Sequence, residues 1–211
     1  MLGANDGILS TASLVLGVAA SGAPRVAIVT AGIAGLVAGA LSMAAGEYVS
    51  VSSQRDAEQA DMRLEERELR IDPRGELREL AGIYEQRGLP PALASEVAMS
   101  LSSRDALQAH ARDELGLDAG RLARPFQAAW SSALSFSGGA TLPLLAVALT
   151  PAWARVGATV VVTLLALGLL GDLGARLGGA PRRAATIRVI AWGALAMAVT
   201  AGIGALVGTV S

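Results

Sequence analysis

Long apolar runs separated by short polar turns dominate the chain. Uncharged stretches at residues 26–46, 125–154 and 189–211 each reach the roughly 20 residues that a membrane-spanning helix needs. Residues 1–23 are interrupted only by Asn5 and Asp6, and residues 156–175 only by Asp172, so both can span if these side chains face protein. The pattern predicts an all-α integral membrane protein with five transmembrane helices.

Charge is concentrated in one insert between the second and third predicted spans. Of the 18 acidic residues, 15 lie within residues 55–124, as do 11 of the 17 basic residues, and every basic residue is Arg. We therefore divide the chain into residues 1–54 with transmembrane helices 1 and 2, residues 55–124 as a helical subdomain, and residues 125–211 with helices 3 to 5.

Turn signals inside the insert predict its helices. No Pro or Gly occurs from Glu47 to Asp72, so the second span is expected to continue as one helix ending near Ile71. Asp72 and Pro73 form a cap and first-turn proline that open the next helix. Two more follow, one from Pro90-Pro91 and one with a serine cap at the start of SSRDALQAHARDELG.

The arginines of the short loops predict the topology. The loop between the last two spans carries four arginines, whereas the other two short loops carry one each. By the positive-inside tendency that loop is cytoplasmic, which places the N-terminus and the insert in the cytoplasm as well. Glycines on spans 2 and 5 favour close helix packing over a dimer seam, which is the alternative; they are Gly32, Gly35, Gly39, Gly202, Gly204 and Gly208.

Composition removes several function classes. The chain has no Cys, which excludes disulfides, thiolate metal sites and Cys nucleophiles. It has a single His and no Ser in a nucleophile-elbow motif, so we expect a protein that is not an enzyme.

Three residues near the cytoplasmic ends of spans 1 and 2 are candidates for an ion pathway. In a hairpin turning at residues 22–25, Asp6 and Met43 both stand about 24–27 Å from the turn at 1.5 Å per residue. Glu47 lies one helical turn nearer the cytoplasm on the same face. Carboxylates within a span are costly, which favours a wet cavity or an ion beside them. The alternative is a solvated position at the membrane interface.

The insert holds a second group of candidate metal ligands. Two glutamate pairs at i, i+3 lie on successive predicted helices, and an imidazole and a carboxylate at i, i+4 lie on the last one. Oxygen and imidazole ligands suit Fe²⁺ or Mn²⁺. Surface ion pairs with the neighbouring arginines are the alternative explanation. The candidates are Glu65, Glu68, Glu76, Glu79, His110 and Glu114.

Four segments in order, ANDGILSTASLVLGVA, AGLVAGALSMAAGEYVSVSSQRD, ELRELAGIYEQRGL and DALQAHARDELGL, resemble the vacuolar iron transporter family over nearly the whole chain. The resemblance implies five transmembrane helices with a cytoplasmic helical metal-binding domain between helices 2 and 3, in a homodimer. It also implies export of Fe²⁺, often also Mn²⁺, from the cytosol in exchange for protons, with no prosthetic group and no nucleic-acid partner.

The family's motifs match individual positions. Its intramembrane Asp matches Asp6, its second-helix Met matches Met43, and the acid of its GEY motif is Glu47. Its metal-binding glutamates match Glu65, Glu68, Glu76, Glu79 and Glu114.

Two positions depart from the family. His110-Ala111 replaces a methionine pair found in some members, and the first motif begins at Ala4 where the family usually has a preceding cytoplasmic segment. We expect a multi-pass protein of the cytoplasmic membrane in a bacterium or of the vacuolar membrane in a eukaryote. The rival hypothesis is a membrane-anchored module for partner interaction or metal sensing.

Overall fold

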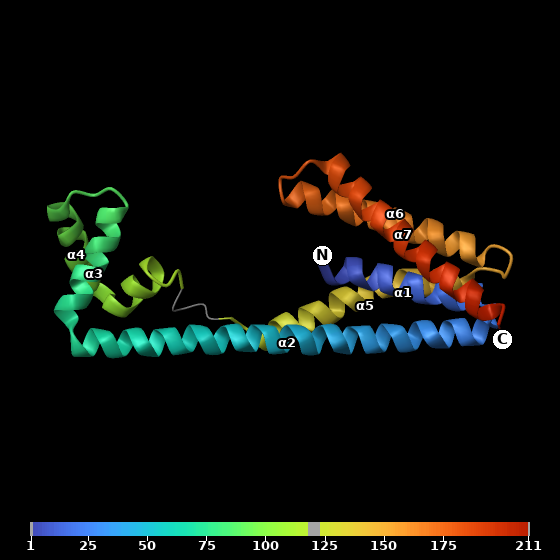
Figure 1. Cartoon of the computed structure of the whole chain (residues 1–211), viewed down its shortest axis with the longest axis horizontal. Coiled ribbons are helices and arrows are strands. Elements are labelled where there is room, and N and C mark those ends of the chain that lie inside the picture. Colours follow the sequence, from blue (N-terminus) through green and yellow to red (C-terminus); the bar gives the residue numbers. More distant parts are fainter. Residues whose placement is uncertain (1, 118–122, 211) are drawn as a thin grey trace. The chain divides into compact units, whose positions relative to one another are not determined.

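The computed structural model describes residues 2–117 and 123–210, and within them it contains seven helices and no strand (Figure 1). The helices are α1 (Leu2–Ala20), α2 (Arg25–Ile71), α3 (Pro73–Gln86), α4 (Pro91–Asp113), α5 (Pro125–Leu149), α6 (Arg155–Leu177) and α7 (Arg182–Gly208). The prediction of an all-α fold is confirmed for these residues. The predicted continuous helix ending near Ile71 is also confirmed.

The chain divides into two compact units. One, called here the membrane unit, comprises Met1–Glu47 and Gln127–Ser211. The other, called the helical unit, comprises Tyr48–Phe126. Helix α2 contributes residues to both units.

Among the described residues, four helices are long and apolar enough to cross a membrane: α2, α5, α6 and α7. Helix α1, with 19 residues, is not among them, and Asn5 and Asp6 reduce its apolar character. Ile8, Ala12, Val15 and Leu16 of α1 are nevertheless buried inside the membrane unit. Leu16 packs with Met197 of α7, and Val15 packs with Ile28 of α2 and Val147 of α5.

Glycines let the backbone of α1 approach its neighbours closely. A Cβ added to Gly7 would overlap the carbonyl group of Phe136, and one added to Gly139 would overlap that of Ala4. A Cβ on Gly204 of α7 would likewise overlap the carbonyl oxygen of Gly17. Close packing is thus confirmed for Gly204, while a Cβ on Gly202 would meet no described atom within 4 Å.

The helical unit is built on α3 and α4. The backbone N–H of Gly75 donates to Asp72 Oδ1 at 2.9 Å, so Asp72 caps α3 as predicted. The chain leaves α3 through Gly88, whose φ of 98° favours glycine. The core between the two helices is formed by Leu80, Ala81, Ala98 and Ala109.

Helix α4 is broken at Asp105, where the backbone is extended (φ −161°, ψ 97°). The backbone N–H of Gln108 donates to Asp105 Oδ1 at 2.9 Å, so Asp105 caps the following turns. The predicted serine cap is therefore wrong. A carboxylate accepts hydrogen bonds from backbone N–H groups more strongly than a hydroxyl does, and the break sets the direction of the segment that carries His110.

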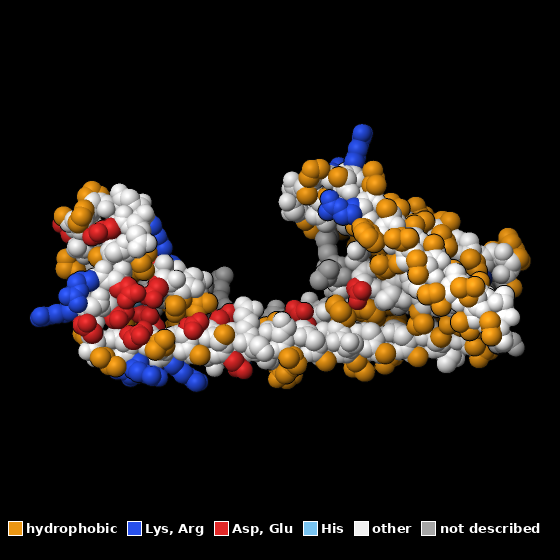
Figure 2. Space-filling model, in the orientation of Figure 1, with side chains coloured by type: hydrophobic (Ala, Val, Ile, Leu, Met, Phe, Trp, Pro, Cys, Tyr) orange, Lys and Arg blue, Asp and Glu red, His pale blue; other side chains and the backbone are white. Residues whose placement is uncertain are grey.

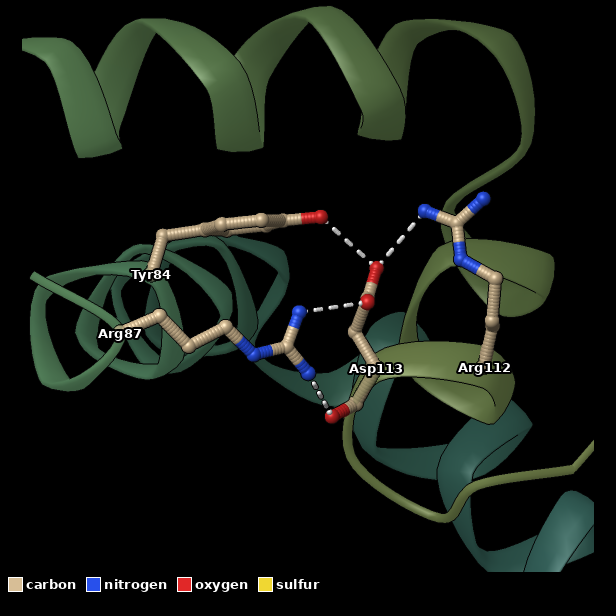
Figure 3. A network of polar contacts seen from close by, with 4 residues as sticks. All are labelled: Tyr84, Arg87, Arg112 and Asp113. Atoms are coloured by element: carbon tan, nitrogen blue, oxygen red, sulfur yellow. Dashed lines mark hydrogen bonds and ion pairs between the residues drawn. The ribbon is translucent and has the colours of Figure 1, made fainter. Parts of the chain in front are cut away.

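A polar network joins the end of α4 to α3 (Figure 3). The Tyr84 hydroxyl donates to Asp113 Oδ2 at 2.8 Å, and Arg87 donates to Oδ1 at 2.8 Å and to the Asp113 carbonyl oxygen at 2.9 Å. Arg112 donates to Oδ2 at 2.8 Å. Burial alone would raise the pKa of Asp113, but the hydrogen bonds from Arg112, Arg87 and Tyr84 outweigh it and lower that pKa to about 2.

We predict that Asp113→Asn lowers the free energy of unfolding by about 1–3 kcal/mol at pH 7, because it removes charge-assisted hydrogen bonds. A carboxyl whose pKa is depressed on folding stabilises above its ordinary pKa of 3.8 and loses that contribution as pH falls toward 2. Thermal unfolding of the full chain in detergent should show the difference shrinking to roughly half at pH 3. Asp61→Asn, at an exposed position of α2, is the control, and a pH-independent difference would contradict the prediction.

Candidate functional site

Three helices bring acidic side chains around one histidine in the helical unit. Glu65 comes from the charged end of α2, outside the apolar run, and Glu76 from the first turn of α3. His110 and Glu114 come from the end of α4, after the break at Asp105. Figure 2 shows acidic side chains gathered on this unit.

The carboxylates converge on His110 Nδ1. This nitrogen lies 2.9 Å from Glu65 Oε1, 3.2 Å from Glu114 Oε2 and 3.7 Å from Glu76 Oε2. His110 is 0% exposed and Glu65 is 3% exposed, so the centre of the cluster is shielded from water. His110 and Glu114, which the sequence places at i, i+4, are thus in contact.

Two polar atoms of the cluster are buried without a hydrogen bond. They are His110 Nε2 and Glu65 Oε1. The short contact from Glu65 Oε1 to Nδ1 therefore lacks hydrogen-bond geometry, although the two atoms are close. Buried polar groups normally have partners. The lone pairs of these two unsatisfied atoms are therefore available to bind a cation.

Burial, with the neighbouring carboxylates as a smaller cause, raises the pKa values of two glutamates in the cluster. Burial raises the pKa of Glu65 to about 7, with His110 opposing the rise and Glu114, Glu76 and Glu68 adding to it. Burial, and then repulsion from Glu79, also raises the pKa of Glu76. One imidazole thus faces more carboxylates than it can neutralise.

The two predicted glutamate pairs are split by the fold. Glu65 and Glu76 are buried in the cluster, whereas Glu68 and Glu79 are exposed and contribute only nearby charge. The alternative explanation was that these glutamates form surface ion pairs with the neighbouring arginines, and few such ion pairs are found. Arg70 lies 3.6 Å from Glu66 and Arg78 lies 4.0 Å from Asp72, both between exposed side chains.

The cluster has the donor set of a divalent metal site. One ligand atom each from Glu65, Glu76 and His110 lie within 4.8 Å of one another. Ligand atoms at about 2.0–2.2 Å from one ion lie up to about 4 Å apart, so small side-chain movements would close the site. Carboxylate oxygen with imidazole nitrogen suits Fe²⁺, Mn²⁺ or Zn²⁺.

A second candidate site lies within the membrane unit. Asp6 and Met43 line one cavity of about 210 Å³, which is the juxtaposition expected from their calculated depth. The other lining residues are Ser10, Thr11, Leu14, Gly35, Gly39, Ser42 and Phe136. Glu47 is exposed and is not among them.

The cavity holds an acid without a counter-charge. Among the residues that the structure describes, the Asp6 carboxylate has no ion pair. The hydroxyl of Thr11 is buried without a hydrogen bond, and our sequence interpretation missed this residue. The signal that would have found it is the polar stripe of Asp6, Ser10 and Thr11 on one side of the first helix.

Comparison with known proteins gives matches along almost the full length. A family model described as "VIT family" matches residues 1–205. The "Vacuolar iron transporter" of Acanthamoeba castellanii is 47% identical over 207 residues, covering 98% of this chain and 76% of that protein. "Vacuolar iron transporter homolog 1" of Arabidopsis thaliana is 41% identical over 210 residues, covering 99% and 82%. "VIT-like transporter 1b" of Glycine max is 37% identical over 209 residues, covering 99% and 74%.

We predict that Glu65→Gln stabilises the metal-free chain at pH 8. A carboxyl whose pKa rises from 4.5 to about 7 on folding binds more protons when folded, so stability falls as pH rises through that window. The amide removes this penalty, and the gain of about 1–3 kcal/mol should disappear near pH 4.5.

The same substitution should weaken metal binding at least tenfold, because it removes a buried anionic ligand. Thermal unfolding at both pH values and Mn²⁺ titration measure the two effects. Glu68→Gln makes the same change one turn away at an exposed position and serves as the control. Equal effects of the two variants would mean that Glu65 has no special place in the site.

Proposed function

The chain belongs to the VIT family, and from that premise we propose that it exports Fe²⁺, and also Mn²⁺, from the cytosol in exchange for protons. The observation that carries the proposal is the cavity in which Asp6 and Met43 meet. A carboxylate and a thioether on one cavity wall are a hard and a soft donor, a combination that a borderline cation such as Fe²⁺ accepts.

We place five transmembrane helices in this protein, with α1 as the first. Support for α1 comes from the burial of Val15 and Leu16 against α2, α5 and α7. The four arginines around the α6–α7 turn favour a cytoplasmic position for that turn, and span counting then puts the helical unit in the cytoplasm. The proposed location is the vacuolar membrane in a eukaryote or the cytoplasmic membrane in a bacterium.

In this proposal the helical unit collects metal from the cytosol. Glu65, Glu76, His110 and Glu114 are its direct ligands, since their side chains converge. Glu68 and Glu79 raise the local negative potential and so attract cations without contacting the ion at this cluster.

Exchange follows from competition for one carboxylate. Asp6 binds either a proton or a metal ion, so arrival of the metal releases the proton and return of a proton releases the metal. Met43 supplies a neutral second donor that does not add to this competition. Glu47, exposed one turn beyond Met43, attracts the ion before it enters. We propose a homodimer as the working assembly, by resemblance to the family.

We predict that Asp6→Asn abolishes Fe²⁺ transport, with at least a tenfold fall in rate, while metal binding by the helical unit is retained. Fe²⁺ uptake into proteoliposomes with an imposed pH gradient and an internal pH dye measures both fluxes together. Mn²⁺ titration of the same preparation measures binding. Loss of both properties would contradict two separate sites, and proton-independent flux would contradict exchange.

We also predict that Met43→Leu, which keeps the volume of the side chain, reduces Fe²⁺ flux several-fold and Mn²⁺ flux less, because Mn²⁺ has the weaker preference for sulfur. Initial rates for the two ions in the same proteoliposomes give the ratio. Leu14→Met, at another residue of the cavity wall, is the matched control for a change of shape. If the ratio of Fe²⁺ to Mn²⁺ transport rates is unchanged, Met43 only packs in the cavity wall and does not bind the ion.

The rival is a membrane-anchored metal sensor, which the buried cluster around His110 also suits. It predicts metal binding by the helical unit with no flux through the wild-type chain. Flux that Asp6→Asn removes would exclude it.

A further inference from the structure

The turn between α6 and α7 gathers positive charge at the end of two apolar helices. Four arginines lie within residues 176–188, and the one acid near them is Asp172 of α6. Figure 2 shows the basic side chains at this end of the α6–α7 hairpin, with hydrophobic side chains along the rest of its visible face. The group has a net charge of about +3 at neutral pH.

Asp172 uses its two oxygens on two of the four arginines. Arg182 Nε donates to Oδ1 at 2.6 Å, and Arg176 Nε lies 2.8 Å from Oδ2. Arg183 and Arg188 are exposed and have no ion pair among the described residues. These two guanidinium groups are therefore available to an external anion.

A pocket opens beside these arginines. Its volume is about 520 Å³, and Asp172, Arg182, Arg183, Thr186 and Ile187 line it. Asp172 fixes Arg182 in place, so one planar donor is already oriented at the pocket wall. The pocket thus offers a held arginine, a free arginine and a hydroxyl, which are the groups that bind phosphate oxygens.

Apolar surface continues directly from the pocket. Ile187 at its wall is 66% exposed, and Leu177, the last residue of α6, is 75% exposed. Both α6 and α7 are long and apolar enough to span a membrane, so their shared turn lies at the level of the lipid headgroups when they do so. A ligand for this place carries a negative headgroup and apolar chains on one molecule.

We propose that this pocket binds an anionic phospholipid, with its phosphate between Arg182 and Arg183 and its acyl chains along the exposed side chains of α6 and α7. Arginines that act only as a topology signal need no pocket and no neighbouring acid that orients them. Basic pockets between transmembrane helices on the cytoplasmic side are typical sites for anionic headgroups. The inference does not depend on which ion the protein carries.

The test uses the full chain in neutral detergent, titrated with phosphatidylglycerol, phosphatidylcholine or inorganic phosphate. Thermal unfolding measures stabilisation, and native mass spectrometry counts retained lipid. We expect saturable stabilisation by phosphatidylglycerol alone. Equal effects of the two lipids would overturn the site, and an equal effect of inorganic phosphate at the same concentration would overturn a lipid as the occupant.

Variants then locate the binding. Arg183→Ala/Arg188→Ala should weaken phosphatidylglycerol binding about tenfold or more, since each arginine near the headgroups contributes attraction. Arg74→Ala/Arg104→Ala removes the same charge from exposed positions of the helical unit and should change binding by less than about twofold. Equal losses from both pairs would overturn the assignment to this pocket. Arg183→Gln alone, with a smaller expected loss, covers the case in which the double variant fails to fold.

Discussion

A carboxylate removed from water needs a compensating positive charge, and the protein meets this requirement unevenly. Asp113 accepts hydrogen bonds from Arg87, Arg112 and Tyr84, and Asp172 is held between Arg176 and Arg182. These acids are fully compensated, and each ties two helical segments together. The carboxylates around His110 are not compensated in this way, and neither is the exposed carboxylate of Asp6. These are the acids that we propose as cation ligands.

The compensated acids support the uncompensated ones. The network around Asp113 fixes the end of α4 against α3, and that end carries His110 and Glu114. The break at Asp105 and the cap at Asp72 fix where the last turns of α4 and the first turn of α3 begin. Four ionisable side chains from three helices are thereby held together, although repulsion among the three carboxylates opposes this arrangement. The packing and ion pairs beside the His110 cluster offset the destabilisation that its carboxylates cause.

Sequence reasoning was reliable where local chemistry decides the outcome. The end of α2 at Ile71, the Asp72 cap and the contact between His110 and Glu114 follow from local signals and helical spacing. Sequence reasoning did not predict which glutamate of each pair is buried. Residues at i and i+3 lie about 60° apart on a helix, and only packing decides which one faces inward. Glu65 is buried and Glu68 is exposed for this reason. The common depth of Asp6 and Met43 was calculable from helix rise, whereas the buried hydroxyl of Thr11 depends on neighbouring helices.

The position of α1 has a consequence for biosynthesis. Its partner Met197 follows Leu16 by roughly 180 residues, so at about 5–20 residues per second it leaves the ribosome roughly 10–35 s later. On the five-span topology, α1 waits in the bilayer during that interval with Asp6 and without its α7 neighbour. At that stage α1 can pack only against α2, through the contact of Val15 with Ile28, since its other described partners have not yet been synthesised. Translation speed and the membrane insertion machinery thus become determinants of how much protein reaches the folded state.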